Sequence, residues 1–164
     1  MLEARVTKYD PRHRVNGAFA RDEWTSIADV GKRFGQHIFT MADYVQAEQR
    51  HVDFLCALVE KCGAFPLRVN GYDVNYRNDA WKDGQEIQHG TLPDIIRANL
   101  REECWCRLVG KGFFIHFGYD YYMYVGCEMP FEAVSALAEK HGLFCEAFRS
   151  PYHDEEEDAC FSAP

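Results

Sequence analysis

The sequence lacks the features that mark membrane, secreted and cofactor-dependent proteins. No apolar run approaches the ~20 residues of a membrane-spanning helix, and Glu3 and Arg5 stand where a secretory signal would be apolar. None of the HExxH, GxSxG, P-loop or GxGxxG motifs occurs. These absences predict a cytoplasmic protein that is not an enzyme and that uses neither a metal nor another cofactor.

Cysteine is present, but its pattern fits neither a disulfide framework nor a zinc site. The chain has seven cysteines, an odd number, and no Cys-x-x-Cys pair. Without an export signal, such cysteines are expected to be reduced thiols. Cys104 and Cys106 lie on an expected strand and supply at most two metal ligands.

Positive charge is also scarce, because 18 basic residues face 26 acidic ones and give a formal net charge of −8. Five of the acids form one run near the C-terminus, and without that run the balance is 18 against 21. A body so close to neutral has no field for phosphate backbones, so nucleic acid is a poor candidate for a partner. The acidic run is either a solvated terminus or an anionic element that engages a basic partner.

Helical periodicity is clearest in residues 41–62, where apolar residues recur at spacings of three, four and seven. Thr40 with Asp43 forms a variant of the capping box before this segment, and Gly63 supplies a left-handed C-cap after it. Thr91 repeats the capping pattern before a second helix. The second and third helices are expected at residues 91–101 and 130–142.

From Cys104 onward the apolar period changes to two, which predicts strands. Three β-rich runs have connections short enough to force an antiparallel meander, namely residues 104–109, 113–118 and 121–126. Other strands are expected at residues 2–8, 65–74 and 143–149. The element order predicts an α+β fold with a mostly antiparallel sheet and about three helices packed on one face. We assign residues 1–153 to a single α+β domain and residues 154–164 to an acidic C-terminal tail.

Alternation sorts the meander into two faces if Val109 pairs with Phe113 and Gly118 pairs with Tyr121. The first face, which we expect the helices to cover, carries Cys104, Cys106, Leu108, Phe114, His116, Tyr121, Met123 and Val125. The second face is aromatic with one arginine and carries Trp105, Arg107, Val109, Phe113, Ile115, Phe117, Tyr122 and Tyr124.

Three explanations compete for this aromatic face. The chain itself buries the face under the N-terminal strand and a loop at residues 75–84. Alternatively, a protein partner or a second copy of the chain covers it, because Trp, Tyr and Arg dominate binding hot spots. In the third explanation the rings stack on bases, as in an RNA-recognition sheet.

The same registration places His116 opposite Cys106 and near Cys104. This arrangement suggests a zinc site that takes a fourth ligand from elsewhere, or a thiol nucleophile that passes its proton to His116. Against both, cysteine is often buried simply as a small apolar group. A metal is therefore not expected, and a thiol-dependent enzyme is kept as an alternative function.

Three stretches resemble a group of small bacterial cytoplasmic proteins, and the resemblance spans most of the chain. The stretches are residues 22–31 (DEWTSIADVG), 100–106 (LREECWC) and 114–124 (FIHFGYDYYMY). The resemblance implies the class of immunity proteins, which neutralise a secreted or contact-delivered toxin and are typically small, acidic and without catalytic motifs. Such proteins differ so much among themselves that no functional residue is carried over to this sequence.

The favoured function is therefore binding, by an immunity-type protein that neutralises a cognate bacterial toxin by covering its active site. The expected contacts are the aromatic face, an exposed turn and the acidic run, which speeds the approach of a basic toxin. These contacts are Trp105, Arg107, Phe117, Tyr119, Asp120, Tyr122 and Tyr124, with Asp154, Glu155, Glu156, Glu157 and Asp158 for steering. The alternatives are a thiol-dependent enzyme that uses Cys106 and His116, and a single-stranded nucleic-acid binder that uses the aromatic face.

Overall fold

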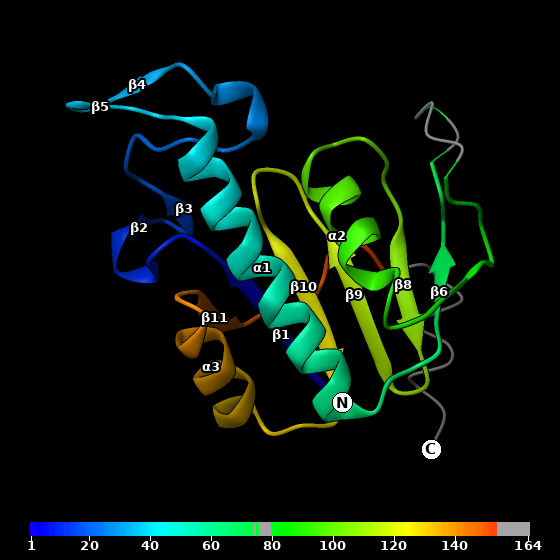
Figure 1. The fold of residues 1–164 in the computed structure, drawn as a ribbon. Coiled ribbons are helices and arrows are strands. Elements are labelled where there is room, and N and C mark those ends of the chain that lie inside the picture. Colours follow the sequence, from blue (N-terminus) through cyan, green and yellow to red (C-terminus); the bar gives the residue numbers. More distant parts are fainter. Residues whose placement is uncertain (74, 76–79, 154–164) are drawn as a thin grey trace.

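The computed structural model describes residues 1–73, 75 and 80–153, and it shows an α+β fold. Seven strands form one antiparallel sheet with the order β11-β1-β10-β9-β8-β6-β7. Three helices lie on one side of this sheet (Figure 1). The expected fold class is confirmed.

The strands of the large sheet include all the runs that the sequence marks, although most are shorter than expected. They are β1 (Leu2–Thr7), β6 (Leu67–Asn70), β7 (Glu86–Ile87), β8 (Arg107–Gly110), β9 (Phe113–Phe117), β10 (Met123–Cys127) and β11 (Phe144–Ala147). Two small hairpins precede the first helix, β2 (Arg14–Val15) with β3 (Ala18–Phe19) and β4 (Arg33–Phe34) with β5 (His37–Ile38). The sequence gives no sign of β7 or the hairpins, because two residues are too few to show a period of two.

The helices are α1 (Met41–Cys62), α2 (Leu92–Leu100) and α3 (Phe131–Lys140). Both expected ends of α1 are confirmed. Asp43 Oδ2 accepts the N–H of Thr40 at 2.8 Å, Thr40 Oγ1 accepts the N–H of Asp43 at 3.2 Å, and Gly63 has a φ of 59°. Thr91 does not cap α2 with its side chain, because its hydroxyl donates instead to the carbonyl oxygen of Gln88 at 3.2 Å.

The core lies between the helices and the inner face of the sheet. Phe54, Leu55 and Leu58 of α1 are buried there against strand residues such as Ile115 and Val125. Each such side chain contributes about 1.5–3 kcal/mol through removal of apolar surface from water. This packing fixes which face of the meander points inward.

The register of the meander differs from the expected one by one residue at each turn. Gly110, not Val109, faces Phe113, so the first loop is one residue shorter than expected. In the second turn the N–H of Gly118 donates to the carbonyl oxygen of Tyr122, not to that of Tyr121, so this loop is one residue longer. The two shifts cancel in β10. Only the side chains of β9 therefore point to the opposite faces from those expected.

The inversion exchanges the two sets of side chains on β9. Phe113, Ile115 and Phe117 point into the core, whereas Phe114 and His116 lie on the outer face. A slip of one residue reverses every side chain of a strand because their period is two. The expected assignment of β9 is therefore wrong, while the expected inward residues of β10, Met123 and Val125, are confirmed.

Candidate functional site

The chain itself covers part of the outer face of the sheet. Residues 148–153, which we call the C-terminal strap, cross β1 and β9 on this face. Ser150 Oγ lies 2.8 Å from His116 Nδ1, and the N–H of Ser150 donates to Glu3 Oε2 at 2.9 Å. His153 Nε2 lies 2.9 Å from the same oxygen of Glu3. The strap therefore covers part of this face, while residues 76–79 of the loop that was expected to cover it lie outside the described residues.

The strap buries two of the expected partner contacts. Arg107 Nη1 donates to the carbonyl oxygen of Tyr152 at 3.0 Å, and the Tyr152 ring lies 5.7 Å from that of Tyr124. Arg107 is 4% exposed and Tyr124 is 7% exposed. Phe117, a third expected contact, is 2% exposed because the register turns it into the core. These three side chains cannot anchor a partner in the conformation shown.

The other expected contacts on the meander stay accessible. Trp105 and Tyr122 are half-buried, while Tyr119 and Asp120 are exposed. Trp105 Nε1 donates to the carbonyl oxygen of Phe117 at 2.8 Å, which fixes its indole beside the outer face. The candidate contact surface is therefore smaller than expected. It consists of the turn between β9 and β10 and the rings of Trp105 and Tyr122.

This turn, which we call the tyrosine turn (residues 119–122), has an unusual backbone. The N–H of Tyr122 donates to the carbonyl oxygen of Tyr119 at 3.1 Å, and the central residues Asp120 and Tyr121 have φ values of 56° and 62°. Left-handed backbone costs an L-residue about 1–2 kcal/mol, and glycine or asparagine usually occupies it in hairpin turns. Tyr119 projects from the turn with 72% of its surface exposed.

Packing beneath the tyrosine turn holds its strained residues in place. Tyr121 is 4% exposed, and its ring lies 5.1 Å from that of Trp24 and 5.0 Å from that of His51. The hydroxyl of Tyr9 donates to the carbonyl oxygen of Asp120 at 2.8 Å. Backbone strain persists only where surrounding contacts over-determine it, and it clusters at functional sites. The sequence alone did not predict the contacts of Tyr9, Trp24 and His51 with this turn. The one available signal is that the connection at residues 119–122 contains no glycine.

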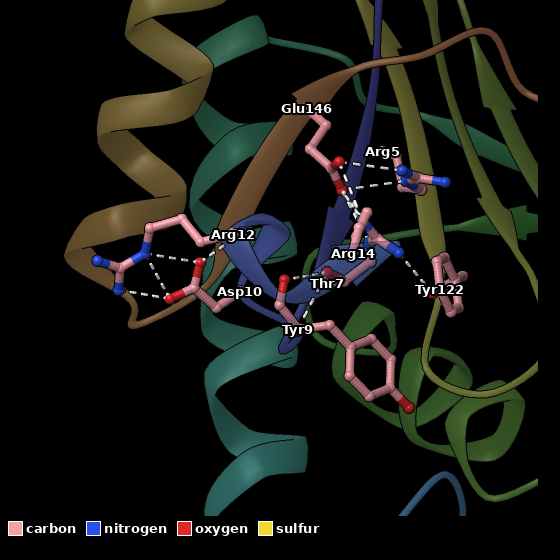
Figure 2. A network of polar contacts seen from close by, with 8 residues as sticks. All are labelled: Arg5, Thr7, Tyr9, Asp10, Arg12, Arg14, Tyr122 and Glu146. Atoms are coloured by element: carbon pink, nitrogen blue, oxygen red, sulfur yellow. Dashed lines mark hydrogen bonds and ion pairs between the residues drawn. The ribbon is translucent and has the colours of Figure 1, made fainter. Parts of the chain in front are cut away.

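Paired charges fix Tyr122 at the base of the tyrosine turn (Figure 2). Glu146 accepts hydrogen bonds from Arg5 Nη2 at 3.0 Å and from Arg14 Nη2 at 2.9 Å, and Arg14 Nη1 donates to Tyr122 Oη at 2.9 Å. Burial tends to raise the pKa of Glu146, but the hydrogen bonds from the two arginines outweigh it and hold this pKa below its ordinary value. Glu146 is therefore ionised at neutral pH and pairs with both arginines, and Arg14 in turn positions the hydroxyl of Tyr122.

The expected pairing of Cys106 with His116 is wrong. Cys106 is buried on the inner side, where its Sγ accepts from Asn99 Nδ2 at 3.4 Å. His116 lies on the outer face and bonds Ser150 of the strap. The sheet separates the two side chains because the register opposes His116 to Arg107. Within the described residues, no group of three or more His, Cys, Asp or Glu side chains could hold a metal ion.

The remaining expected contacts, the acidic run at residues 154–158, lie outside the described residues. None of the helices in the described part of the chain is both long and apolar enough to cross a membrane. Comparisons of the chain with protein-family models, with curated proteins and with solved structures find no match. The site must therefore be interpreted from its own geometry.

Proposed function

We propose that this chain is an immunity-type protein that binds a cognate bacterial toxin and covers its active site. In this proposal the tyrosine turn is the centre of the contact surface. The observation that carries the proposal is an exposed tyrosine held on a rigid, strained turn: Tyr119 is 72% exposed, while the next two residues adopt left-handed backbone.

A tyrosine in this position suits protein recognition. Its ring offers a large contact area with only two side-chain torsions to immobilise, and tyrosine is enriched in binding hot spots. The hydrogen bond from Tyr9 to the Asp120 carbonyl holds the turn before any partner arrives, which lowers the entropic cost of binding. Trp105 and Tyr122, both half-buried, would form the rim of the contact.

Charge supports a basic partner. The formal net charge is −8, Asp120 is exposed on the turn, and the acidic run follows the strap. A negative surface speeds encounter with a positively charged protein, and salt weakens this effect. We therefore expect the association rate to fall as ionic strength rises, with a smaller change in the dissociation rate.

The test uses as candidate toxin the C-terminal domain of an exported protein encoded beside this chain. Growth of cells that express this domain should be restored by co-expression of the full chain. The double variant Tyr119→Ala with Asp120→Asn should raise the dissociation constant about 100-fold, as loss of a hot spot does. Asparagine removes the charge of Asp120 but tolerates left-handed backbone, so the unfolding midpoint should stay unchanged.

A matched control lies at the opposite end of β9. Lys111→Ala with Glu128→Gln also removes one side chain and one carboxylate from exposed positions, and it should leave the dissociation constant within about twofold, as expected for residues outside a hot spot. The proposal is wrong if the chain fails to restore growth, or if the double variant in the tyrosine turn binds as tightly as the control.

A further inference from the structure

The dipeptide Asn-Gly occurs twice in the chain, as Asn16-Gly17 and as Asn70-Gly71. In this dipeptide the main-chain nitrogen of the glycine attacks the side-chain carbonyl carbon of the asparagine, and the lack of a Cβ on glycine favours the attack. A C–N bond forms, ammonia leaves, and a succinimide ring remains. Water then breaks one of the two C–N bonds of the ring and yields either aspartate or isoaspartate. The structure gives the two dipeptides opposite surroundings for this reaction.

Asn16-Gly17 forms the exposed tip of the hairpin between β2 and β3. Val15 pairs with Ala18, so these two residues are the whole loop. Their φ values of 51° and 83° are both positive, as a type I′ turn requires. Residues 15–18 are all exposed, and a Cβ added to Gly17 would meet no atom within 4 Å. Solvent therefore reaches both the side chain of Asn16 and the peptide that follows it.

This hairpin is also a segment that opens locally. Its strands have two residues each, and they form a small sheet of their own beside the seven-stranded one. A ribbon of two strands is at best marginally stable, and the opening of such a segment costs far less free energy than global unfolding. Ring closure requires rotation of the backbone between Asn16 and Gly17, and the open form of the hairpin permits it.

Asn70-Gly71 is protected by the large sheet. Asn70 is the last residue of β6 and pairs with Arg107 of β8. The side-chain oxygen of Asn70 is buried. A Cβ added to Gly71 would lie 2.6 Å from Arg107 Nη2, so the guanidinium packs directly against this glycine. Ring closure here requires the separation of paired strands in the large sheet, which has a higher free-energy cost than opening of the hairpin.

We propose that Asn16 is a site of spontaneous covalent modification, at which release of ammonia and addition of water convert the residue to aspartate or isoaspartate. Isoaspartate routes the main chain through its Cβ, so the loop gains one backbone atom and no longer fits a two-residue turn. The hairpin carries Arg14, which donates to Tyr122 Oη at 2.9 Å and to Glu146 Oε2 at 2.9 Å. The modification therefore disturbs a support of Tyr122. It is independent of toxin binding, because it needs no partner.

The test incubates the full chain at mildly alkaline pH and follows the peptides that contain Asn16 and Asn70 by mass spectrometry. An isoaspartate-specific methyltransferase labels the isoaspartate product. In the folded chain the product should accumulate at Asn16 at least about tenfold faster than at Asn70, because only the hairpin opens readily. In urea both positions should react at the same rate, since the same dipeptide is then equally accessible.

Variants separate the longer backbone from the new charge. The N–H of Ala20 donates to the carbonyl oxygen of His13 at 2.9 Å across the base of the hairpin. Protection of this N–H from exchange should fall in the modified chain and persist in Asn16→Asp, which adds the charge alone. Asn16→Gly, which tolerates left-handed backbone, should form no product at position 16 and should keep its protection throughout the incubation.

Three results would overturn the proposal. The first is an equal rate at Asn16 and Asn70 in the folded chain. The second is the absence of product at Asn16 over a period in which the chain in urea reacts. The third is protection of Ala20 that does not differ between the modified chain and Asn16→Asp, which would show that the longer backbone does not disturb the hairpin.

Discussion

The two turns of the meander connect consecutive antiparallel strands by different means. Between β8 and β9 the left-handed position belongs to Gly112, where an added Cβ would meet nothing closer than the Glu128 carboxylate at 3.5 Å. Between β9 and β10 the left-handed positions belong to Asp120 and Tyr121, whose Cβ atoms make this backbone conformation unfavourable. The first turn is therefore stable through local backbone preference, whereas the second depends on tertiary packing.

The two tyrosines of this turn therefore differ: the ring of Tyr121 is packed inside the domain, whereas Tyr119 is exposed to solvent. Tyr121 joins the tyrosine turn to α1 and to the segment that contains Trp24, so that folding of the whole domain pins the turn. The turn then presents Tyr119 without a flexible glycine beside it. In the proposed function, this strained backbone would serve binding by holding Tyr119 in one position.

The largest expected effect comes from breaking this link. Tyr121→Ala should lower the free energy of unfolding by about 3–5 kcal/mol, because a buried ring is lost. Tyr121→Gly should cost about 0.5 kcal/mol less, because relief of left-handed strain exceeds the greater freedom of glycine in the unfolded chain. Urea denaturation measures both values. A larger loss in Tyr121→Gly than in Tyr121→Ala would show that strain at position 121 is smaller than this entropic cost.

Acid should destabilise the tyrosine turn before the turn between β8 and β9, because the His51 ring packs against the Tyr121 ring. The pKa of His51 is lowered from the ordinary 6.5 to about 4 by burial. Between these values the unfolded chain binds a proton that the folded chain does not, so stability falls as pH falls from 6.5 to 4. This loss amounts to about 3 kcal/mol at the lower limit.

Two measurements check this pH dependence. The free energy of unfolding should decline over that interval in the native chain and less steeply in His51→Gln. Amide exchange at pH 5, corrected for intrinsic rates, should show less protection at Tyr122 than at Phe113. An NMR titration that gives His51 an ordinary pKa would contradict the expectation.

The sequence predicts most securely what local chemistry determines. Thr40, Asp43 and Gly63 specify both ends of α1 through hydrogen bonds within a few residues, and the structure confirms them. The register of β9 could not be predicted in the same way, because Gly110 and Gly112 allow loops of two or three residues. A choice between these loops depends on the core that the strand buries, which is a property of the whole fold.

The site was predictable only where it does not depend on register or on distant segments. Tyr119 and Asp120 lie on a short connection, and their exposure follows from that position. The burial of Arg107 and Tyr124 depends on the strap, which returns across β1 and β9 from the C-terminal end. Residues 148–153 show no hydrophobic periodicity from which this contact could be predicted.

The smallest expected effect comes from exchanging the residue types at the left-handed positions of the two turns, glycine in one and a residue with a side chain in the other. Gly112→Ala should lower the free energy of unfolding by about 1–2 kcal/mol, because alanine is strained at positive φ. Asp120→Gly should change it by less than about 0.5 kcal/mol, since relief of strain is offset by the greater freedom of glycine in the unfolded chain. Thermal and urea unfolding of the two variants and of the double variant measure this asymmetry. A loss of more than about 1 kcal/mol in Asp120→Gly would show that the Asp120 side chain itself stabilises the turn, which would assign it to structure rather than to binding.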